Sequence, residues 1–294
     1  MNLISQVGNT PLLPISESQY TFWGKAEFMN PGGSVKDRPV SYIIQQAELE
    51  GSLQPGNTIC EATSGNTGIA FAMFAANLGY KCVIVMPSNM SEERKKMFKV
   101  YGAELVEVEA GNFDLAIATR DRLCKENGWF NGNQFHSQWN VDAHYKTTGA
   151  ELVKQCIENN FKPDAFILGT GTGGTLMGAG KRLKEIFPDI KIIAIEPAES
   201  PVMSGGSPGI HGIQGIGDGS KFLVDLDFVD EVIIIPTECA IEHSKYLSKT
   251  RGLFLGISAG ANVRGSFQWL ADNNMKNAIT ILCDRGERYF SNYV

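Results

Sequence analysis

The stretch Asn30-Pro31-Gly32-Gly33-Ser34-Val35-Lys36-Asp37-Arg38 predicts a glycine-rich turn that places one lysine at the start of a helix. A lysine withdrawn from water at the positive end of a helix becomes a nucleophilic amine that can form a Schiff base with an aldehyde. Because most lysines in a first helical turn are solvated surface charges, this assignment depends on the loops that accompany it. We take Lys36 as the candidate that holds an aldehyde cofactor.

A second loop has the sequence EATSGNTG at residues 61–68 and is predicted to join a strand to a helix. Unpaired backbone N–H groups at a helix start suit an anion, so a carboxylate would bind them and the hydroxyls of Thr63, Ser64 and Thr67. The amide of Asn66 would then hydrogen-bond a ring hydroxyl. The alternative is an ordinary N-cap box followed by a glycine turn.

A third loop, GTGTGGT at residues 169–175, is predicted to follow a strand and to begin a helix. Its N–H donors suit a phosphate, and the candidate phosphate-binding residues are Gly171, Thr172, Gly173, Gly174 and Thr175. The loop also fits the G-x-G-x-x-G pattern of dinucleotide sites, with Glu196 placed 22 positions after Gly174. We rank the dinucleotide site second because it leaves the other loops unexplained.

A fourth segment, LGISAGA at residues 255–261, is another turn into a helix, with Ser258 at the expected cap position. If Ser258 instead faces a pyridine nitrogen, its hydroxyl does not force that nitrogen to stay protonated, which favours elimination over transamination. An ordinary helix cap is the alternative. The four histidines show no catalytic pairing, which predicts structural or surface roles for them.

The composition excludes several classes of protein. The chain has 294 residues, and 26 Lys and Arg against 32 Asp and Glu give a net charge of −6, which disfavours nucleic-acid binding. The six cysteines are widely spaced and form no zinc motif, so we expect no metal site and reduced thiols in the cytoplasm. The N-terminal residues do not form a secretory signal, and no segment predicts a membrane span.

Short β-branched runs alternate with helix-period segments, which predicts an α/β fold with mostly parallel sheets. The chain is longer than a usual single core, so we expect two lobes, residues 35–135 and residues 1–34 with 136–294. The loop at 200–219 is too long for a simple connection and is expected to be functional. The predicted strands are 58–61, 81–86, 104–108, 165–168, 192–195, 232–235 and 278–282, and the predicted helices are 65–78, 91–101, 113–126, 143–159, 172–186, 237–250 and 258–272.

Taken together, these motifs resemble the cysteine synthases (O-acetylserine sulfhydrylases), pyridoxal-phosphate enzymes of the tryptophan-synthase-β-like group. The resemblance runs nearly end to end, through VGNTPL at 7–12, PGGSVKDR at 31–38, EATSGNTG at 61–68, residues 97–105, GTGTGGT at 169–175, IEP at 195–197 and GISAGA at 256–261. It implies a two-lobed fold of pyridoxal-phosphate fold type II, with the cofactor in the cleft between the lobes. It also implies a mobile subdomain at about residues 80–125 and a homodimer.

The resemblance implies that O-acetyl-L-serine and sulfide are converted to L-cysteine and acetate through an α-aminoacrylate intermediate. By this resemblance Lys36 is the Schiff-base lysine and removes the Cα proton, Asn66 contacts the ring hydroxyl, and Ser258 contacts the pyridine nitrogen. The residues implied for the phosphate are Gly171, Thr172, Gly173, Gly174 and Thr175, and those for the amino-acid substrate are Thr63, Ser64, Asn66, Thr67, Gln134 and Gly215.

Within the family, two segments resemble the B-type isozyme, NMSEER at 89–94 and CDRGERY at 283–289, whereas HGIQGIG at 211–217 resembles the A-type. This mixture leaves the leaving group and the nucleophile open. Asp218 stands where an A-type enzyme has a small residue, and it either selects an acceptor with an amino group or is solvated. Cys283 and Asp284 are further candidates near the pyridine, although a buried structural cysteine is the commoner case.

Three alternatives remain at this point. A cystathionine β-synthase and a cysteine lyase that makes sulfide and lanthionine both share the α-aminoacrylate step. A noncatalytic nucleotide-binding or partner-binding module belongs to a different class, and the combination of Lys36, Asn66 and Ser258 argues against it.

Overall fold

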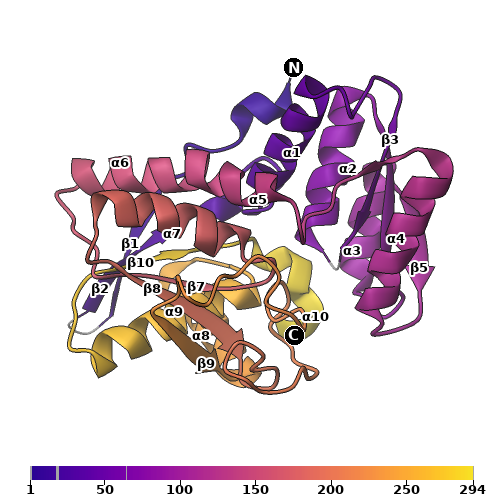
Figure 1. Cartoon of the computed structure of the whole chain (residues 1–294). Helices are drawn as coiled ribbons and strands as arrows, with labels where there is room; N and C mark the ends of the chain where they lie inside the picture. The colour runs from indigo at the N-terminus through magenta and orange to yellow at the C-terminus, as the bar shows by residue number, and fades with distance from the viewer. Residues whose placement is uncertain (1, 18–19, 64, 294) are drawn as a thin grey trace. The chain divides into compact units, whose positions relative to one another are not determined.

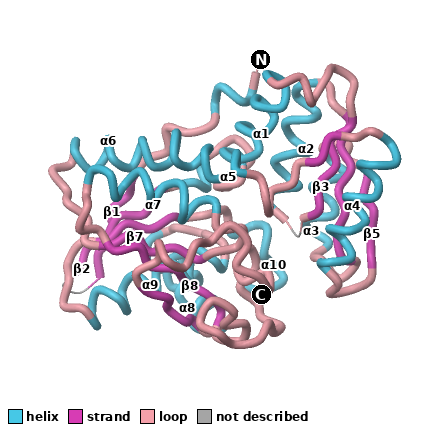
Figure 2. The backbone as a smooth tube through the Cα atoms, in the orientation of Figure 1, coloured by secondary structure: helices cyan, strands magenta, loops and turns pink. Residues whose placement is uncertain are grey.

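The structure is a computed structural model that describes residues 2–17, 20–63 and 65–293. It divides into two compact units, the first made of Met1–Val7 and Asn30–Asn140 and the second of Gly8–Met29 and Val141–Val294. Figure 1 shows the elements of each unit, and Figure 2 shows that both combine strands with helices. The predicted α/β class is confirmed.

The sheet of the first unit is parallel throughout, with the strand order β5-β4-β3-β6. Its strands are β3 (Thr58–Ala62), β4 (Lys81–Pro87), β5 (Glu104–Val108) and β6 (Phe130–Asn131). Its helices are η1 (Leu3–Gln6), α1 (Asp37–Leu49), α2 (Asn66–Leu78), α3 (Glu92–Val100) and α4 (Phe113–Asn127), whereas η2 (Glu27–Met29) belongs to the second unit. The carboxyl ends of β3 and β4 therefore lie side by side, with Ala62 paired to Val85.

Alternating side chains of these strands pack into two separate hydrophobic cores, one on each face of the sheet. Ile59 and Ile84 point to the face covered by α1 and α2, whereas Cys60 and Val85 point to the face covered by α4. Successive residues of a strand face opposite sides, so strands with both faces covered are apolar throughout. This double burial explains the continuous apolar run at residues 82–86 of β4.

The sheet of the second unit has the strand order β1-β2-β10-β7-β8-β9, and it is parallel except for the antiparallel pair β1 and β2. Its strands are β1 (Leu12–Glu17), β2 (Tyr20–Lys25), β7 (Ala165–Gly169), β8 (Lys191–Pro197), β9 (Glu231–Ile235) and β10 (Ala278–Ile281). The β1–β2 pair was not among the predicted elements, because its strands interleave polar residues with the apolar ones, as in Ser16 and Thr21.

Helices cover both faces of this second sheet. They are η3 (His144–Gly149), α6 (Ala150–Glu158), α7 (Gly174–Ile186), α8 (Thr237–Arg251), α9 (Ile257–Asp272), η4 (Gly286–Tyr289) and α10 (Phe290–Tyr293), and α5 (Gln138–Ala143) crosses the boundary of the units. In Figure 1, α6 and α7 run together on one side of this sheet, and α8 and α9 lie on the other. No helix within the described residues is long and apolar enough to cross a membrane.

The prediction of one continuous helix over 143–159 was wrong in its detail. Residues 144–149 form a π-helical segment between α5 and α6. Gly178 of α7 packs against this segment so closely that a Cβ atom at Gly178 would lie 2.2 Å from the carbonyl oxygen of Val141 and 2.8 Å from Cβ of His144. A π-helical turn is rare and frequently occurs at functional sites.

Candidate active site

Lys36 lies at the N-cap of α1, as the sequence predicted, and its side chain is half-buried. The turn before it is fixed by two interactions. The N–H of Gly33, at a φ of 76°, donates to the carbonyl of Asn30 at 2.8 Å, and the N–H of Gly32 donates to the carboxylate of Asp37. Asp37, which directly follows Lys36, is thus a buried carboxylate in the first turn of the helix.

The carboxylate loop, residues 63–67, lies between β3 and α2. Gly65 is the N-cap of α2, and the hydroxyl of Thr63 accepts a hydrogen bond from the N–H of Gly65 at 3.1 Å. Ser64, a predicted substrate-binding residue, lies outside the described residues. Because Gly65 has no side chain to cap the helix, the N–H groups of this first turn can bind an anion.

The structure brings together two predicted substrate residues that are 67 positions apart. The hydroxyl of Thr67 donates to Oε1 of Gln134 at 2.6 Å, and Nε2 of Gln134 donates to the carbonyl of Ala62 at 3.1 Å. Thr67 is 3% exposed and Gln134 is 5% exposed. Gln134 is therefore held against the carboxylate loop by both ends of its amide.

Arg94 of α3 also lies against this loop, and the sequence analysis did not single it out. A Cβ atom at Gly65 would lie 3.0 Å from the guanidinium carbon of Arg94, which is 3% exposed. A buried guanidinium beside a helix N-terminus adds positive charge where an anion is expected to bind. The one sequence signal for Arg94 is its position in segment 89–94, which resembles the B-type isozyme.

The phosphate loop, residues 169–175, lies in the second unit between β7 and α7. Gly173 is the N-cap of α7 at a φ of 86°, and a Cβ atom there would lie 2.6 Å from Cγ2 of Val224. A Cβ atom at Gly171 would lie 2.7 Å from the carbonyl oxygen of Gly215. Glycine is thus required at both positions, which keeps the N–H groups of the loop near the start of the helix.

His144, for which the sequence predicted a structural or surface role, lies beside the phosphate loop. Its Nε2 lies 3.1 Å from the hydroxyl of Thr175 and its Nδ1 lies 2.9 Å from the hydroxyl of Thr148. The ring is 1% exposed. His144, the first residue of the π-helical segment, therefore contacts the hydroxyl of a predicted phosphate-binding residue.

Glu196, the residue expected to bind a ribose in the dinucleotide alternative, is used elsewhere. Its Oε2 accepts from the N–H of Met203 at 2.7 Å, and its Oε1 accepts from the N–H of Ser204 at 2.9 Å and from the hydroxyl of Ser204. The carboxylate is 2% exposed. Glu196 thus anchors the long loop after β8. Its carboxylate oxygens are used in that anchor, which argues against the ribose contact that the dinucleotide alternative requires.

Ser258 lies in the first turn of α9 and is 4% exposed, but Gly256 is the N-cap. The ordinary-cap alternative for Ser258 is therefore excluded. One turn later, Asn262 accepts from the N–H of Gly169 at 2.7 Å and donates to the carbonyl of Ile281 at 2.8 Å. Asn262 thereby ties the helix that carries Ser258 to the start of the phosphate loop.

The three further candidates also lie in the second unit. Sγ of Cys283 lies 3.4 Å from Nδ2 of Asn262, and the carboxylate of Asp284 accepts from the hydroxyl of Tyr289. A Cβ atom at Gly256 would lie 2.0 Å from Oδ1 of Asp284. A Cβ atom at Gly171 would lie 3.1 Å from Oδ2 of Asp218, so Asp218 borders the phosphate loop.

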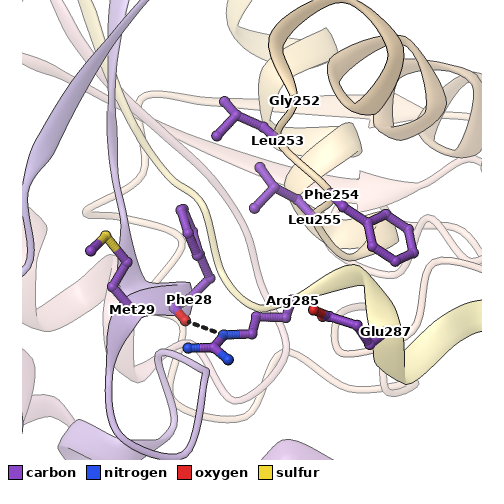
Figure 3. A pocket seen from close by; sticks show the side chains of 8 residues that line it. All are labelled: Phe28, Met29, Gly252, Leu253, Phe254, Leu255, Arg285 and Glu287. Atoms are coloured by element: carbon purple, nitrogen blue, oxygen red, sulfur yellow. Dashed lines mark hydrogen bonds between the residues drawn. The ribbon is translucent and has the colours of Figure 1, made fainter.

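A separate hollow on the second unit contains none of the predicted site residues (Figure 3). It has a volume of about 390 Å³ and is lined by Phe28, Met29, Gly252, Leu253, Phe254, Leu255, Arg285 and Glu287. Figure 3 shows the side chain of Arg285 directed at the carbonyl of Phe28, to which its Nε donates at 3.0 Å. Over the described part of the chain, no group of His, Cys, Asp and Glu side chains could hold a metal ion, and the six cysteines are free thiols.

Comparison with known proteins places the chain among enzymes. Residues 3–284 match the family model described as "Pyridoxal-phosphate dependent enzyme". The chain is 42% identical over 298 residues to a cysteine synthase of Staphylococcus aureus, an alignment that covers 99% of this chain and 95% of that protein.

Two solved structures are similar over the whole fold. A cysteine synthase from Entamoeba histolytica has a TM-score of 0.91 at 37% identity, covering 99% of this chain and 89% of that one. A hydrogen sulfide-producing enzyme from Fusobacterium nucleatum has a TM-score of 0.94 at 37% identity, covering 98% and 89%.

Proposed function

Because the chain belongs to the pyridoxal-phosphate dependent enzymes and is related to the cysteine synthases along its length, we propose that it converts O-acetyl-L-serine and sulfide to L-cysteine and acetate. The fold is that of pyridoxal-phosphate fold type II, and pyridoxal phosphate is the cofactor. The observation that carries the proposal is the 42% identity to a cysteine synthase over 99% of this chain.

The residues present fit the cofactor. The glycines at 171 and 173 keep the phosphate loop open at a helix start, where a phosphate is favoured. Pyridoxal phosphate, when bound, withdraws electrons from the Cα atom of an amino acid attached to it. In this proposal Lys36 and Asn66 of the first unit hold the same cofactor as Ser258 and the phosphate-binding residues of the second unit, which are Gly171, Thr172, Gly173, Gly174 and Thr175.

The chain's own residues then divide the remaining work. The amine of Lys36 takes the Cα proton of the substrate and later returns it to the product. The N–H groups of the carboxylate loop, together with Thr63, Ser64, Asn66, Thr67, Gln134 and Gly215, bind and orient the amino acid. We further propose that a mobile segment at about residues 80–125 closes over the substrate and excludes water.

The reaction is tested by comparing three substrate pairs on the purified protein. We expect kcat/KM for O-acetyl-L-serine with sulfide to exceed that for L-serine with homocysteine by at least about tenfold, because only acetate is a good leaving group without further activation. L-cysteine alone is the third condition, and sulfide release measures it. Nucleotide binding without any visible absorbance from a bound cofactor would support the noncatalytic alternative instead.

One observation favours a second candidate, in which L-cysteine itself is the substrate and a second L-cysteine is the acceptor. Breaking the Cβ–S bond of the first cysteine releases sulfide, and the thiol of the second forms a new Cβ–S bond to give lanthionine. Asp218 supplies a carboxylate beside Gly171 that suits the ammonium group of such an acceptor. The similarity to a hydrogen sulfide-producing enzyme is consistent with this candidate.

The substitution Asp218→Ala separates the two candidates. If Asp218 binds the ammonium of an acceptor, the variant loses about tenfold in kcat/KM for sulfide release from L-cysteine and stays within about twofold for O-acetyl-L-serine with sulfide. Steady-state assays of both reactions measure this. Asp227→Ala, which removes an exposed carboxylate downstream, is the control. Equal losses in both reactions would show that Asp218 has no role in choosing the acceptor.

We also propose that the enzyme works as a homodimer in the cytoplasm. Free thiols and the lack of a membrane-spanning helix in the described residues are compatible with this location. Light scattering of the purified protein tests the dimer.

A further inference from the structure

Glu61, the last polar residue of β3 before the carboxylate loop, is buried without any exposure. A buried carboxylate is costly unless a cation and hydrogen-bond donors surround it, and apolar residues of similar size are often as stable. Burial raises the pKa of Glu61, and the neighbouring guanidinium of Arg120 opposes that rise. A charge in this position therefore needs an explanation beyond stability.

The surroundings of Glu61 consist of donors from three elements of the first unit. Oε1 accepts from Nη1 of Arg120 in α4 at 2.9 Å and from the N–H of Ala62 at 2.8 Å. Oε2 accepts from the N–H of Gln134 at 3.2 Å. The carboxylate thus links the end of β3 and α4 to the segment that carries Gln134.

Arg120 is in turn held in one orientation. It is 1% exposed, and its Nε and Nη2 both lie 2.9 Å from Oδ1 of Asp121. The planar guanidinium therefore contacts two carboxylates with different edges. A lysine, which carries a single ammonium group, cannot reproduce both contacts.

The hydrogen bonds of Gln134 decide which donors remain for a substrate. Thr67 gives its only hydroxyl proton to Oε1 of Gln134, and one N–H of the Gln134 amide goes to Ala62. Among the described residues, the second N–H of that amide is left for a ligand. The carboxylate donors of this arrangement are then the Gln134 amide and the backbone N–H groups of the first turn of α2, that of Thr67 included, while the hydroxyl of Thr67 positions Gln134.

We propose that Glu61 is a positioning residue for recognition of the substrate carboxylate, acting through Gln134 and held in place by Arg120. This inference rests on the proposed function, since it concerns the amino-acid site of that reaction. Without the Glu61 carboxylate, the backbone of Gln134 loses its anchor, and the side-chain amide no longer presents its N–H at a fixed place.

The test is the variant Glu61→Gln, which keeps the size of the side chain and removes its charge. Binding of L-serine and of L-serinamide is followed by the visible absorbance of the bound cofactor. We expect the dissociation constant of L-serine to rise about tenfold and that of L-serinamide to rise less than about twofold, because only L-serine has a carboxylate to recognise. A merely structural role would weaken both ligands equally.

The matched control is Glu151→Gln. Glu151 forms a second ion pair, with the buried Nζ of Lys25 at 2.7 Å; its own side chain is 19% exposed, and it lies in the other unit. This control is expected to lower the thermal unfolding midpoint and to leave the ratio of the two dissociation constants unchanged. If Glu61→Gln fails to fold, Arg120→Lys replaces it, with an expected rise of about threefold for L-serine only.

A second measurement does not depend on the cofactor. In the cofactor-free protein, Glu61→Gln is expected to speed amide hydrogen exchange at Gln134 at least about tenfold and to leave the core strand β4 unchanged. An unchanged ratio of dissociation constants, or unchanged exchange at Gln134, overturns the inference. A wild-type protein that binds no pyridoxal phosphate or does not respond to L-serine refutes the proposed function instead, and the exchange result still decides the role of Glu61.

Discussion

Replacing Lys36 by alanine is expected to abolish the visible absorbance of bound pyridoxal phosphate and to lower kcat/KM by about 10³-fold or more. The reason is that one amine serves both to attach the cofactor and to move the Cα proton, and each role alone contributes a large factor. Lys36 lies at the N-cap of α1, so the substitution does not interrupt the helix. The absorbance spectrum of the purified protein and a steady-state assay measure the two effects.

Lys99→Ala provides the control for this experiment, because Lys99 is an exposed lysine of α3. It is expected to keep both the absorbance and the activity. Persistence of the absorbance band in the Lys36 variant would mean that another amine holds the cofactor. The assignment of Lys36 would then be wrong, even if the activity fell.

Replacing Gly173 by alanine is expected to weaken cofactor binding by about 10- to 100-fold. The residue has a φ of 86°, which an alanine adopts only at a cost, and its Cβ atom would lie 2.6 Å from Cγ2 and 2.9 Å from the backbone nitrogen of Val224. To relieve this contact the loop must move, which would weaken its hydrogen bonds to the phosphate. Each hydrogen bond to a charged group contributes about 1.5–3 kcal/mol. Titration of the cofactor-free protein with pyridoxal phosphate, followed by absorbance, gives the dissociation constant.

Gly56→Ala is a matched control, since Gly56 has a φ of 84° and a Cβ atom there would meet nothing within 4 Å. It introduces the same backbone strain without a clash, and it lies between α1 and β3 in the first unit, whereas the phosphate loop belongs to the second. We expect a lower thermal unfolding midpoint and an unchanged cofactor dissociation constant. If both variants bind the cofactor like the wild type, the phosphate is held elsewhere.

The order of strands and helices followed from the sequence where both faces of a strand are buried. The predicted strands 58–61, 81–86 and 165–168 agree with the buried strands β3, β4 and β7 to within one residue. The β1–β2 pair escaped prediction because its polar residues hide the apolar pattern. The π-helical segment also escaped prediction, and Gly178, which packs closely against it, lies more than 25 positions further along the chain.

What the sequence alone determined is the set of glycine-rich strand-to-helix loops, and with them the cofactor class and the family. These features are local, since a left-handed φ at Gly33 or Gly173 and a helix start are encoded within a few residues. What only the tertiary structure decided is how the side chains of those loops are paired. Gln134 meets Thr67 and Glu61 across 67 and 73 positions, and His144 meets Thr175 across 31. Such pairs depend on which elements pack together, and packing is set by the whole core and not by any single segment.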